Sequence, residues 1–125
     1  MKSIVFDEKT LHFDCSLGSI NDVFIKELGG KFEDISNMQE LENNAPKMVE
    51  LVRDLLLSGH IYWLFCNGEE EEGERLLSKI RSSRMIATKW VLQEGLINVI
   101  QGITQDLFPN DLDTPREEVK TPKKK

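Results

Sequence analysis

Residues 46–59 read Pro46-Lys-Met-Val-Glu-Leu-Val-Arg-Asp-Leu-Leu-Leu-Ser-Gly59. The apolar side chains recur every three or four positions, which is the spacing of one face of a helix. They are Met48, Leu51, Val52, Leu55 and Leu56. Pro46 suits the first turn of a helix, and we expect Gly59 to end it. This stretch therefore predicts an amphipathic helix.

The segment that follows, residues 60–66, is the most apolar and aromatic of the chain. It is too short for its periodicity to separate a buried strand from a packed helix. Because the segments on both sides have helical spacing, we expect a helix, and a buried strand remains the alternative.

Two short helices are predicted before residue 46. Ser19 and Asp22 have the spacing of a capping box, and the apolar positions behind them end at Gly29-Gly30. The second short helix is capped by Asp34 or Ser36 and carries three apolar side chains. These are Ile35, Met38 and Leu41.

Two helices are also predicted after residue 66. One begins in the acidic run 69–74, where the helix dipole favours carboxylates, and ends near the cations Lys79 and Arg81. The other is the longest of the chain, is capped by Ser82 or Ser83, and continues to Phe108. Its apolar positions exceed one narrow stripe, which indicates packing by more than one neighbour.

The N-terminus predicts a β-hairpin, with strands at 3–7 and 10–15 around a charged turn. Leu11, Phe13 and Cys15 are two residues apart and therefore lie on one face, while His12 falls on the polar face. An isolated hairpin is only marginally stable, so this one is expected to pack on the helices.

Together these segments predict a mainly α fold, a small bundle of about five to six helices with the N-terminal hairpin packed on it. The chain has 125 residues, 39% hydrophobic and 30% charged, which is typical of one globular domain. We expect that domain to cover residues 1–108, with the hairpin at 3–15 and the helices at 19–108. Residues 109–125 are polar and broken by prolines, and predict a flexible tail.

Composition argues against several classes of function. The net charge of −6 disfavours nucleic-acid binding, which depends on Lys and Arg neutralising phosphates. No apolar run approaches the roughly 18 residues that span a bilayer, and charges follow the N-terminus too early for an export signal. Cys15 and Cys66 lack metal-ligand spacing and are expected to be buried thiols in a reducing cytosol.

The sequence also contains no recognisable catalytic or metal site. His12 and His60 are isolated from one another, and Glu69 to Glu72 are consecutive, whereas calcium loops alternate ligands with spacers. The common phosphate, dinucleotide, zinc and acyl-transfer motifs do not occur. We therefore expect no enzymatic activity and no metal or cofactor.

Protein binding is the remaining class of function, because aromatic and large apolar side chains gather in two segments. The 61–65 segment and the last helix hold residue types that are frequent at interface centres. The candidate protein-binding residues are Tyr62, Trp63, Phe65, Trp90, Leu96, Val99, Ile100 and Ile103. The alternative for all of them is ordinary core packing.

The order of the segments resembles the small tail assembly chaperones of long-tailed bacteriophages and related prophages. The resemblance covers roughly residues 1–110 and starts with a hairpin followed by a short helix that ends Glu27-Leu-Gly-Gly30. Asp34-Ile-Ser-Asn-Met38 comes next, and Ala45-Pro46 then opens the helix that continues as Leu51-Val-Arg-Asp-Leu-Leu-Leu-Ser-Gly-His60. The runs Trp90-Val-Leu-Gln-Glu-Gly-Leu-Ile97 and Asp106-Leu-Phe-Pro109 fit the same family.

This resemblance implies a protein of the infected host's cytoplasm that is not retained in the mature virion. It would bind the tape-measure protein, help recruit tail-tube subunits and associate with itself. The family commonly has a longer frameshifted form, with which Lys123-Lys-Lys125 is compatible. The alternative function is a prophage-encoded helical adaptor or regulator, monomeric or dimeric. A small enzyme without a recognised motif is the third reading.

Overall fold

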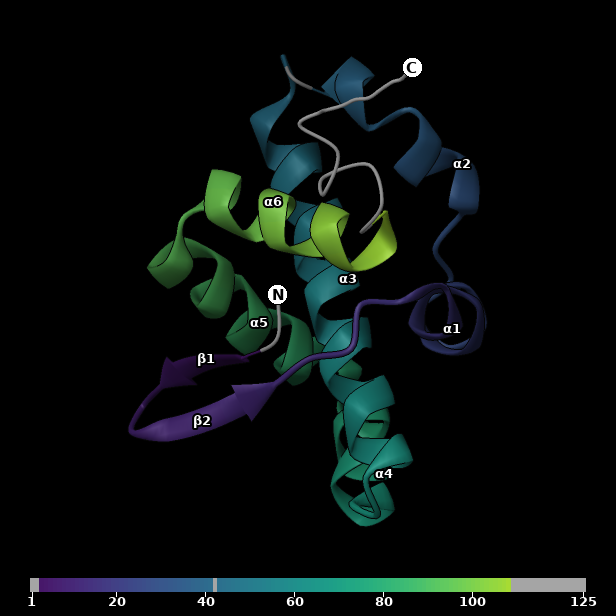
Figure 1. Cartoon of the computed structure of the whole chain (residues 1–125), viewed down its shortest axis with the longest axis vertical. Helices are drawn as coiled ribbons and strands as arrows, with labels where there is room; N and C mark the ends of the chain where they lie inside the picture. Colours follow the sequence, from purple (N-terminus) through teal and green to yellow (C-terminus); the bar gives the residue numbers. More distant parts are fainter. Residues whose placement is uncertain (1–2, 42, 109–125) are drawn as a thin grey trace, which may run out of the picture.

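The protein folds as a mainly helical bundle that carries an N-terminal two-stranded hairpin (Figure 1). The computed structural model describes residues 3–41 and 43–108. The predicted fold class is confirmed. The predicted flexible tail, 109–125, lies outside the described residues. Within these, no helix has the length and apolarity that are needed to cross a bilayer.

Helix α3, Ala45–Cys66, is the longest element and runs through the middle of the molecule (Figure 1). At its start the Asn44 side chain accepts a hydrogen bond from the Lys47 amide, and Pro46 occupies the first turn as predicted. Residues 60–66 are helical, which confirms the preferred reading of that segment. Most of the side chains that are buried in α3 are aliphatic, so this helix forms the centre of the core.

The prediction that Gly59 ends this helix is wrong, because α3 continues to Cys66. The glycine instead allows another segment to pack closely against the helix. A Cβ atom at Gly59 would collide with the sulfur of Cys15, and the Gly59 carbonyl accepts a hydrogen bond from the Asp14 amide at 3.0 Å. The segment that leaves the hairpin thus touches the backbone of α3, and only a residue without a side chain allows this approach.

The hairpin consists of β1, Ser3–Phe6, and β2, Lys9–His12, paired antiparallel. Asp7 and Glu8 form its two-residue turn, and both have positive φ, as tight hairpin turns require. β1 ends one residue earlier than predicted because Asp7 belongs to the turn. β2 ends at His12 because the chain beyond it turns inward, where the Phe13 and Cys15 side chains are buried against the helices.

Two side chains of the helices fasten the hairpin. Gln93 Nε2 donates to the Val5 carbonyl at 2.7 Å, and the His60 Nδ1 atom lies 2.8 Å from the His12 carbonyl. The predicted polar position of His12 is only half right, because its ring stacks on Trp63 with centroids 4.6 Å apart. The hairpin therefore packs on the bundle, as expected.

The segment between the hairpin and α3 is irregular. It begins with α1, Leu17–Ser19, which continues into a wider π-helical turn, η1, Ile20–Ile25. The predicted capping box at Ser19 is wrong. Ser19 is buried inside the helical segment, and its hydroxyl donates backward to the Ser16 carbonyl at 2.9 Å.

The next helix, α2, covers Phe32–Ser36, and the 3₁₀ turn η2 covers Met38–Leu41. The predicted caps are wrong, because Asp34 lies within α2 and Ser36 is its last residue. Lys31 precedes the helix, so the chain enters it three residues earlier than the nearer predicted cap, Asp34, would indicate.

Helix α4, Glu70–Ser78, begins in the acidic run as predicted. The predicted last helix is wrong in two respects. It starts earlier, as α5, Ile80–Glu94, within which the Ser83 hydroxyl donates to the Leu76 carbonyl.

It also divides at Gly95, whose φ of 92° ends α5 and redirects the chain into α6, Leu96–Leu107. In Figure 1, α5 lies on one side of α3, the coil labelled α1 lies on the other, and α6 crosses in front of α3.

Candidate protein-binding groove

The eight predicted binding residues fall into three environments. Trp90, Val99 and Ile103 are almost fully buried and belong to the core, so they present no surface to a partner in this structure. The indole of Trp90 contacts the Phe13 and His60 rings edge-on. For these three residues the structure agrees with the alternative of core packing.

Tyr62, Trp63 and Phe65 are half-buried and pack on neighbouring elements of the same chain. Trp63 stacks on the hairpin, as described above. Tyr62 lies against Gly18 of α1, and Phe65 lies against Gly73 of α4, where a Cβ would come within 2.9 Å of its ring. The aromatic cluster thus joins the C-terminal half of α3 to the hairpin, α1 and α4.

Leu96 and Ile100 lie in a different setting, on the wall of a groove of about 720 Å³. The opposite wall is formed by α2 and η2, and the first turns of α3 complete it. The lining residues are Ile35, Ser36, Met38, Gln39, Ala45, Met48, Leu96, Ile97, Ile100 and Thr104. None of these ten carries a charge, so the groove suits an apolar occupant.

Helix α6 can line this groove because it has two adjacent apolar faces. At about 100° per residue, Val99 and Ile103 share one face, and Leu96, Ile97 and Ile100 share the next. The first face is buried in the core, and the second borders the groove. The broad apolar surface that the sequence showed on this helix is therefore divided between the core and the groove.

Among the described residues, Ile97 is the most exposed large apolar side chain, with 70% of its surface accessible. It was not among the predicted binding residues, although it is an apolar residue of the predicted last helix. Its position next to Leu96 and one turn before Ile100 was the available signal. The contribution of Ile35, Met38 and Met48 depends on how distant segments meet, which the sequence does not reveal.

A second cleft, of about 520 Å³, lies between η1, α3 and α5 and is lined by several charged side chains. Asp54 accepts from Arg53 Nε at 3.0 Å and from Arg84 Nε at 3.2 Å, and Arg84 also donates to the Leu28 carbonyl. These bonds tie α5 to α3 and to the end of the η1 segment. The bonds of Asp54 and Arg84 in this cleft therefore connect elements of the fold.

The buried polar groups are arranged for packing. Burial lowers the pKa of His60 below its usual value, although the hydrogen bond to the His12 carbonyl acts in the opposite direction. Burial also raises the pKa of the Cys15 thiol to about 12, which leaves it protonated and unreactive.

Cys66 differs from the prediction, because it is exposed at the end of α3. Among the described residues, no three His, Cys, Asp or Glu side chains are placed to hold a metal ion.

Comparison with protein-family models, with curated proteins and with solved structures finds no match to this chain.

Proposed function

We propose that this protein is a tail assembly chaperone of a long-tailed bacteriophage, which holds an amphipathic helix of the tape-measure protein in the groove between α6 and the α2–η2 segment. The observation that carries the proposal is the uncharged and mostly apolar lining of this groove, with Ile97 exposed at its edge. The tape-measure protein is proposed as the partner because the order of the segments resembles that of the chaperone family. A hairpin followed by a helical bundle is consistent with this order.

The dimensions of the groove suit side chains from one face of a helix. Its volume of about 720 Å³ lies in the range of ordinary ligand pockets, roughly 300–1,000 Å³. Helices that bind in grooves insert apolar side chains spaced three or four residues apart and keep their polar face in water. An uncharged lining accepts such residues without leaving a buried charge unpaired.

The remaining steps of the proposal concern assembly. Many copies, which also associate with one another, would cover a long tape-measure helix in the host cytoplasm, recruit tail-tube subunits and leave before the tail is complete. Covering the apolar face of a long helix keeps it from aggregating until the tube surrounds it.

The test is co-expression with the tape-measure and tail-tube proteins of the same genome, followed by affinity purification. We expect the wild-type protein to retain the tape-measure protein in solution and Ile97→Asp to lose it, because a carboxylate would be desolvated in an apolar groove. Leu17→Asp is the matched control, since Leu17 is 59% exposed and lies outside the groove. Circular dichroism should show both variants folded.

Retention of the tape-measure protein by Ile97→Asp would overturn the groove assignment. Failure of the wild-type protein to capture either tail component would overturn the chaperone assignment and favour the adaptor. The position of the gene, between those for the tube and the tape measure or elsewhere, discriminates the same two functions independently.

A further inference from the structure

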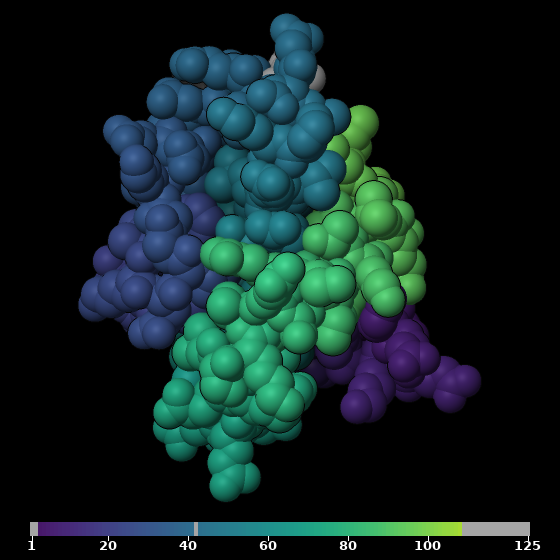
Figure 2. Space-filling model, turned by 180° about the vertical axis from the view of Figure 1, so that it is seen from behind, coloured from purple at the N-terminus to yellow at the C-terminus, as the bar shows by residue number. Residues whose placement is uncertain are grey.

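The outward face of α5 differs in charge from the rest of the molecule. α5 contains three cationic side chains and one acidic side chain, Glu94 at its end, although the whole chain has a net charge of −6. α5 lies on the side of the molecule that faces the viewer in Figure 2, where its green atoms are not covered by another element.

The exposed side of α5 has an apolar centre with cations beside it. At about 100° per residue, Met85 and Leu92 lie within roughly 20° of each other around the helix, with Arg81 and Lys89 to either side. Met85 is 65% exposed and Leu92 is 69% exposed. The opposite side of the helix is buried, so the orientation of α5 is fixed.

The apolar area extends beyond these two side chains. Ile86 is exposed at the edge of the same surface. The Gln93 hydrogen bond holds β1 beside the end of α5, and Val5 on that strand is 62% exposed. We call this surface, which consists of Val5, Arg81, Met85, Ile86, Lys89 and Leu92, the α5 face.

The two cations of the α5 face are available to a partner. Within residues 3–41 and 43–108, no carboxylate lies within ion-pair distance of Arg81 or Lys89. The other arginines of this region are engaged elsewhere, because Arg75 pairs with Glu72 and Arg84 pairs with Asp54.

We propose that the α5 face binds an acidic amphipathic helix of a partner protein, at a site separate from the groove. Apolar side chains of the partner would cover Met85 and Leu92, while carboxylates flanking its apolar stripe would pair with Arg81 and Lys89. Complementary charge at the edge of an apolar contact orients the partner and accelerates its association.

Two other occupants fit the α5 face less well. A second copy packed α5 against α5 in antiparallel orientation would bring its own Arg81 and Lys89 close to the same cations, which is repulsive. The acidic outer side of α4 has the right charge, but its exposed residues Glu70, Glu71 and Glu74 offer nothing apolar to cover Met85 and Leu92.

The probe is a labelled synthetic helix with leucines along one face and glutamates on both sides of them, and its counterpart carries lysine in place of every glutamate. Fluorescence anisotropy with the full chain should show tighter binding of the acidic peptide than of the lysine peptide. The affinity should fall as NaCl rises from about 50 mM to about 500 mM, because the ion pairs lie at the surface.

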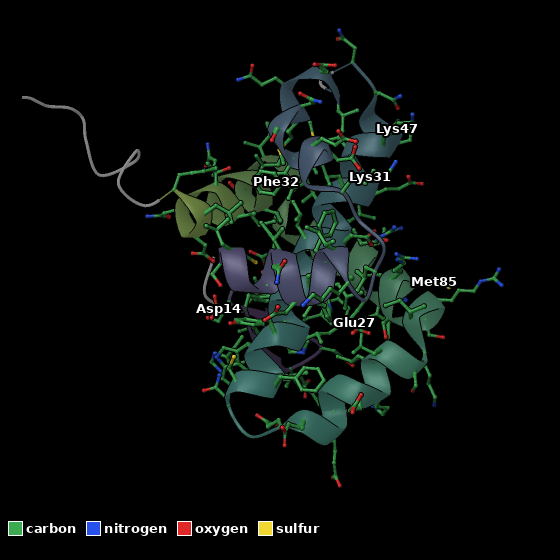
Figure 3. The ribbon with its side chains drawn as sticks, turned by 90° about the vertical axis from the view of Figure 1, so that its right-hand side faces the viewer. Asp14, Glu27, Lys31, Phe32, Lys47 and Met85 are labelled. Carbon is green, nitrogen blue, oxygen red and sulfur yellow. The ribbon has the colours of Figure 1, made fainter. Side chains whose placement is uncertain are left out.

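Variants of exposed residues locate the site without threatening the fold. Leu92→Asp and the double variant R81E/K89E should each weaken the acidic peptide at least about tenfold. Lys31→Glu is the matched control, since it reverses an exposed cation beside the exposed Phe32, away from Met85 (Figure 3). Ile97→Asp should also leave this binding unchanged, which separates the α5 face from the groove.

Four results would overturn the proposal. These are equal binding of the lysine peptide, loss of peptide binding in Ile97→Asp but not in Leu92→Asp, attachment to phosphatidylserine vesicles without peptide binding, and dimerisation that Leu92→Asp abolishes. The first would show that charge does not select the partner. The second would assign the peptide to the groove, the third would assign the α5 face to a membrane, and the fourth to a second copy.

Discussion

Single residues decide how closely the segments of this protein approach one another. Gly59 is the clearest case, since it lies in the middle of α3 and touches the chain that leaves the hairpin. In an open helix, alanine is more favourable than glycine by up to about 1 kcal/mol. The sign of the stability change on Gly59→Ala therefore shows whether the close contact or the helix propensity dominates.

We expect Gly59→Ala to destabilise the protein by about 1–3 kcal/mol, because the new methyl group would overlap the Cys15 sulfur. Urea denaturation measures the change. Cys15→Ala in the same chain should recover part of the loss, since it removes the overlapping atom. A stabilising effect of the single substitution would contradict the close packing that the structure shows.

His60 makes stability depend on pH. Its native pKa is lowered by burial, so below about pH 6.5 the unfolded chain takes up a proton that the folded protein resists. The contribution of neutral His60 to stability is therefore fully present above that pH and is lost as the pH is lowered toward the native pKa. His60→Asn keeps a donor for the His12 carbonyl but does not titrate.

We expect the wild-type protein to lose more thermal stability than His60→Asn between about pH 7.5 and about pH 5. Carboxylates titrate in both proteins, so the difference between the two curves isolates the imidazole. Melting followed by circular dichroism at each pH gives the curves, and parallel curves would show that His60 does not contribute.

The two cysteines should differ sharply in reactivity. Burial raises the Cys15 pKa to about 12 and shields its sulfur, whereas Cys66 is exposed. A chromogenic disulfide reagent at about pH 8 should label one thiol in the native protein and both in denaturant. Cys66→Ser should leave the folded protein unlabelled, and rapid labelling of that variant would mean that Cys15 becomes accessible.

At the scale of elements, the apolar periodicity of the sequence predicted most of the helices but placed several of their ends wrongly. α3 was predicted because its apolar positions keep one spacing over many turns. The expected caps followed from residue type, and at Ser19 also from its spacing to Asp22. They were Ser19, Asp34 or Ser36, and Ser82 or Ser83. The hydroxyl of a serine inside a helix can donate a hydrogen bond to the carbonyl of an earlier residue, as Ser19 does. Residue type alone therefore does not identify the end of a helix.

Gly95 shows the opposite case, in which a glycine does end a helix. Its φ of 92° is a conformation that other residues adopt only at a cost of about 1–3 kcal/mol. We expect Gly95→Ala to destabilise the protein by a similar amount in urea denaturation. Gln101→Ala, at an exposed position within α6, should change stability by less than about 0.5 kcal/mol and serves as the control.

If Gly95→Ala proves neutral, the bend between α5 and α6 does not depend on that conformation. If it is destabilising as expected, the same variant should also lose affinity at the groove, because α6 supplies one of the groove's walls.

At the scale of the whole molecule, the fold class and the placement of the hairpin on the helices followed from the sequence. The groove did not, because its walls come from α2, η2, α3 and α6, whose relative positions are set by packing. Leu96 and Ile100 were predicted as binding residues and do border it. Trp90 has the residue type of an interface anchor but is covered by Phe13 and His60.

Asp54 and its two arginines link elements that are distant in the sequence. We expect Asp54→Ala to cost about 1–3 kcal/mol, because it leaves both guanidinium groups without their carboxylate partner. Glu50→Ala is the matched control. It removes a carboxylate from the same cleft, but Glu50 forms no ion pair with the described residues. Equal stability of the two variants would show that the ion pairs are not important.

A two-stranded sheet has two free edges, and extended segments of other chains tend to add strands there, which leads to fibrils. Here each strand has one carbonyl already occupied, that of Val5 by Gln93 and that of His12 by His60. The hairpin is also short and has a charged turn. Copies crowded side by side during synthesis should therefore remain separate molecules and not merge their strands into a continuous sheet.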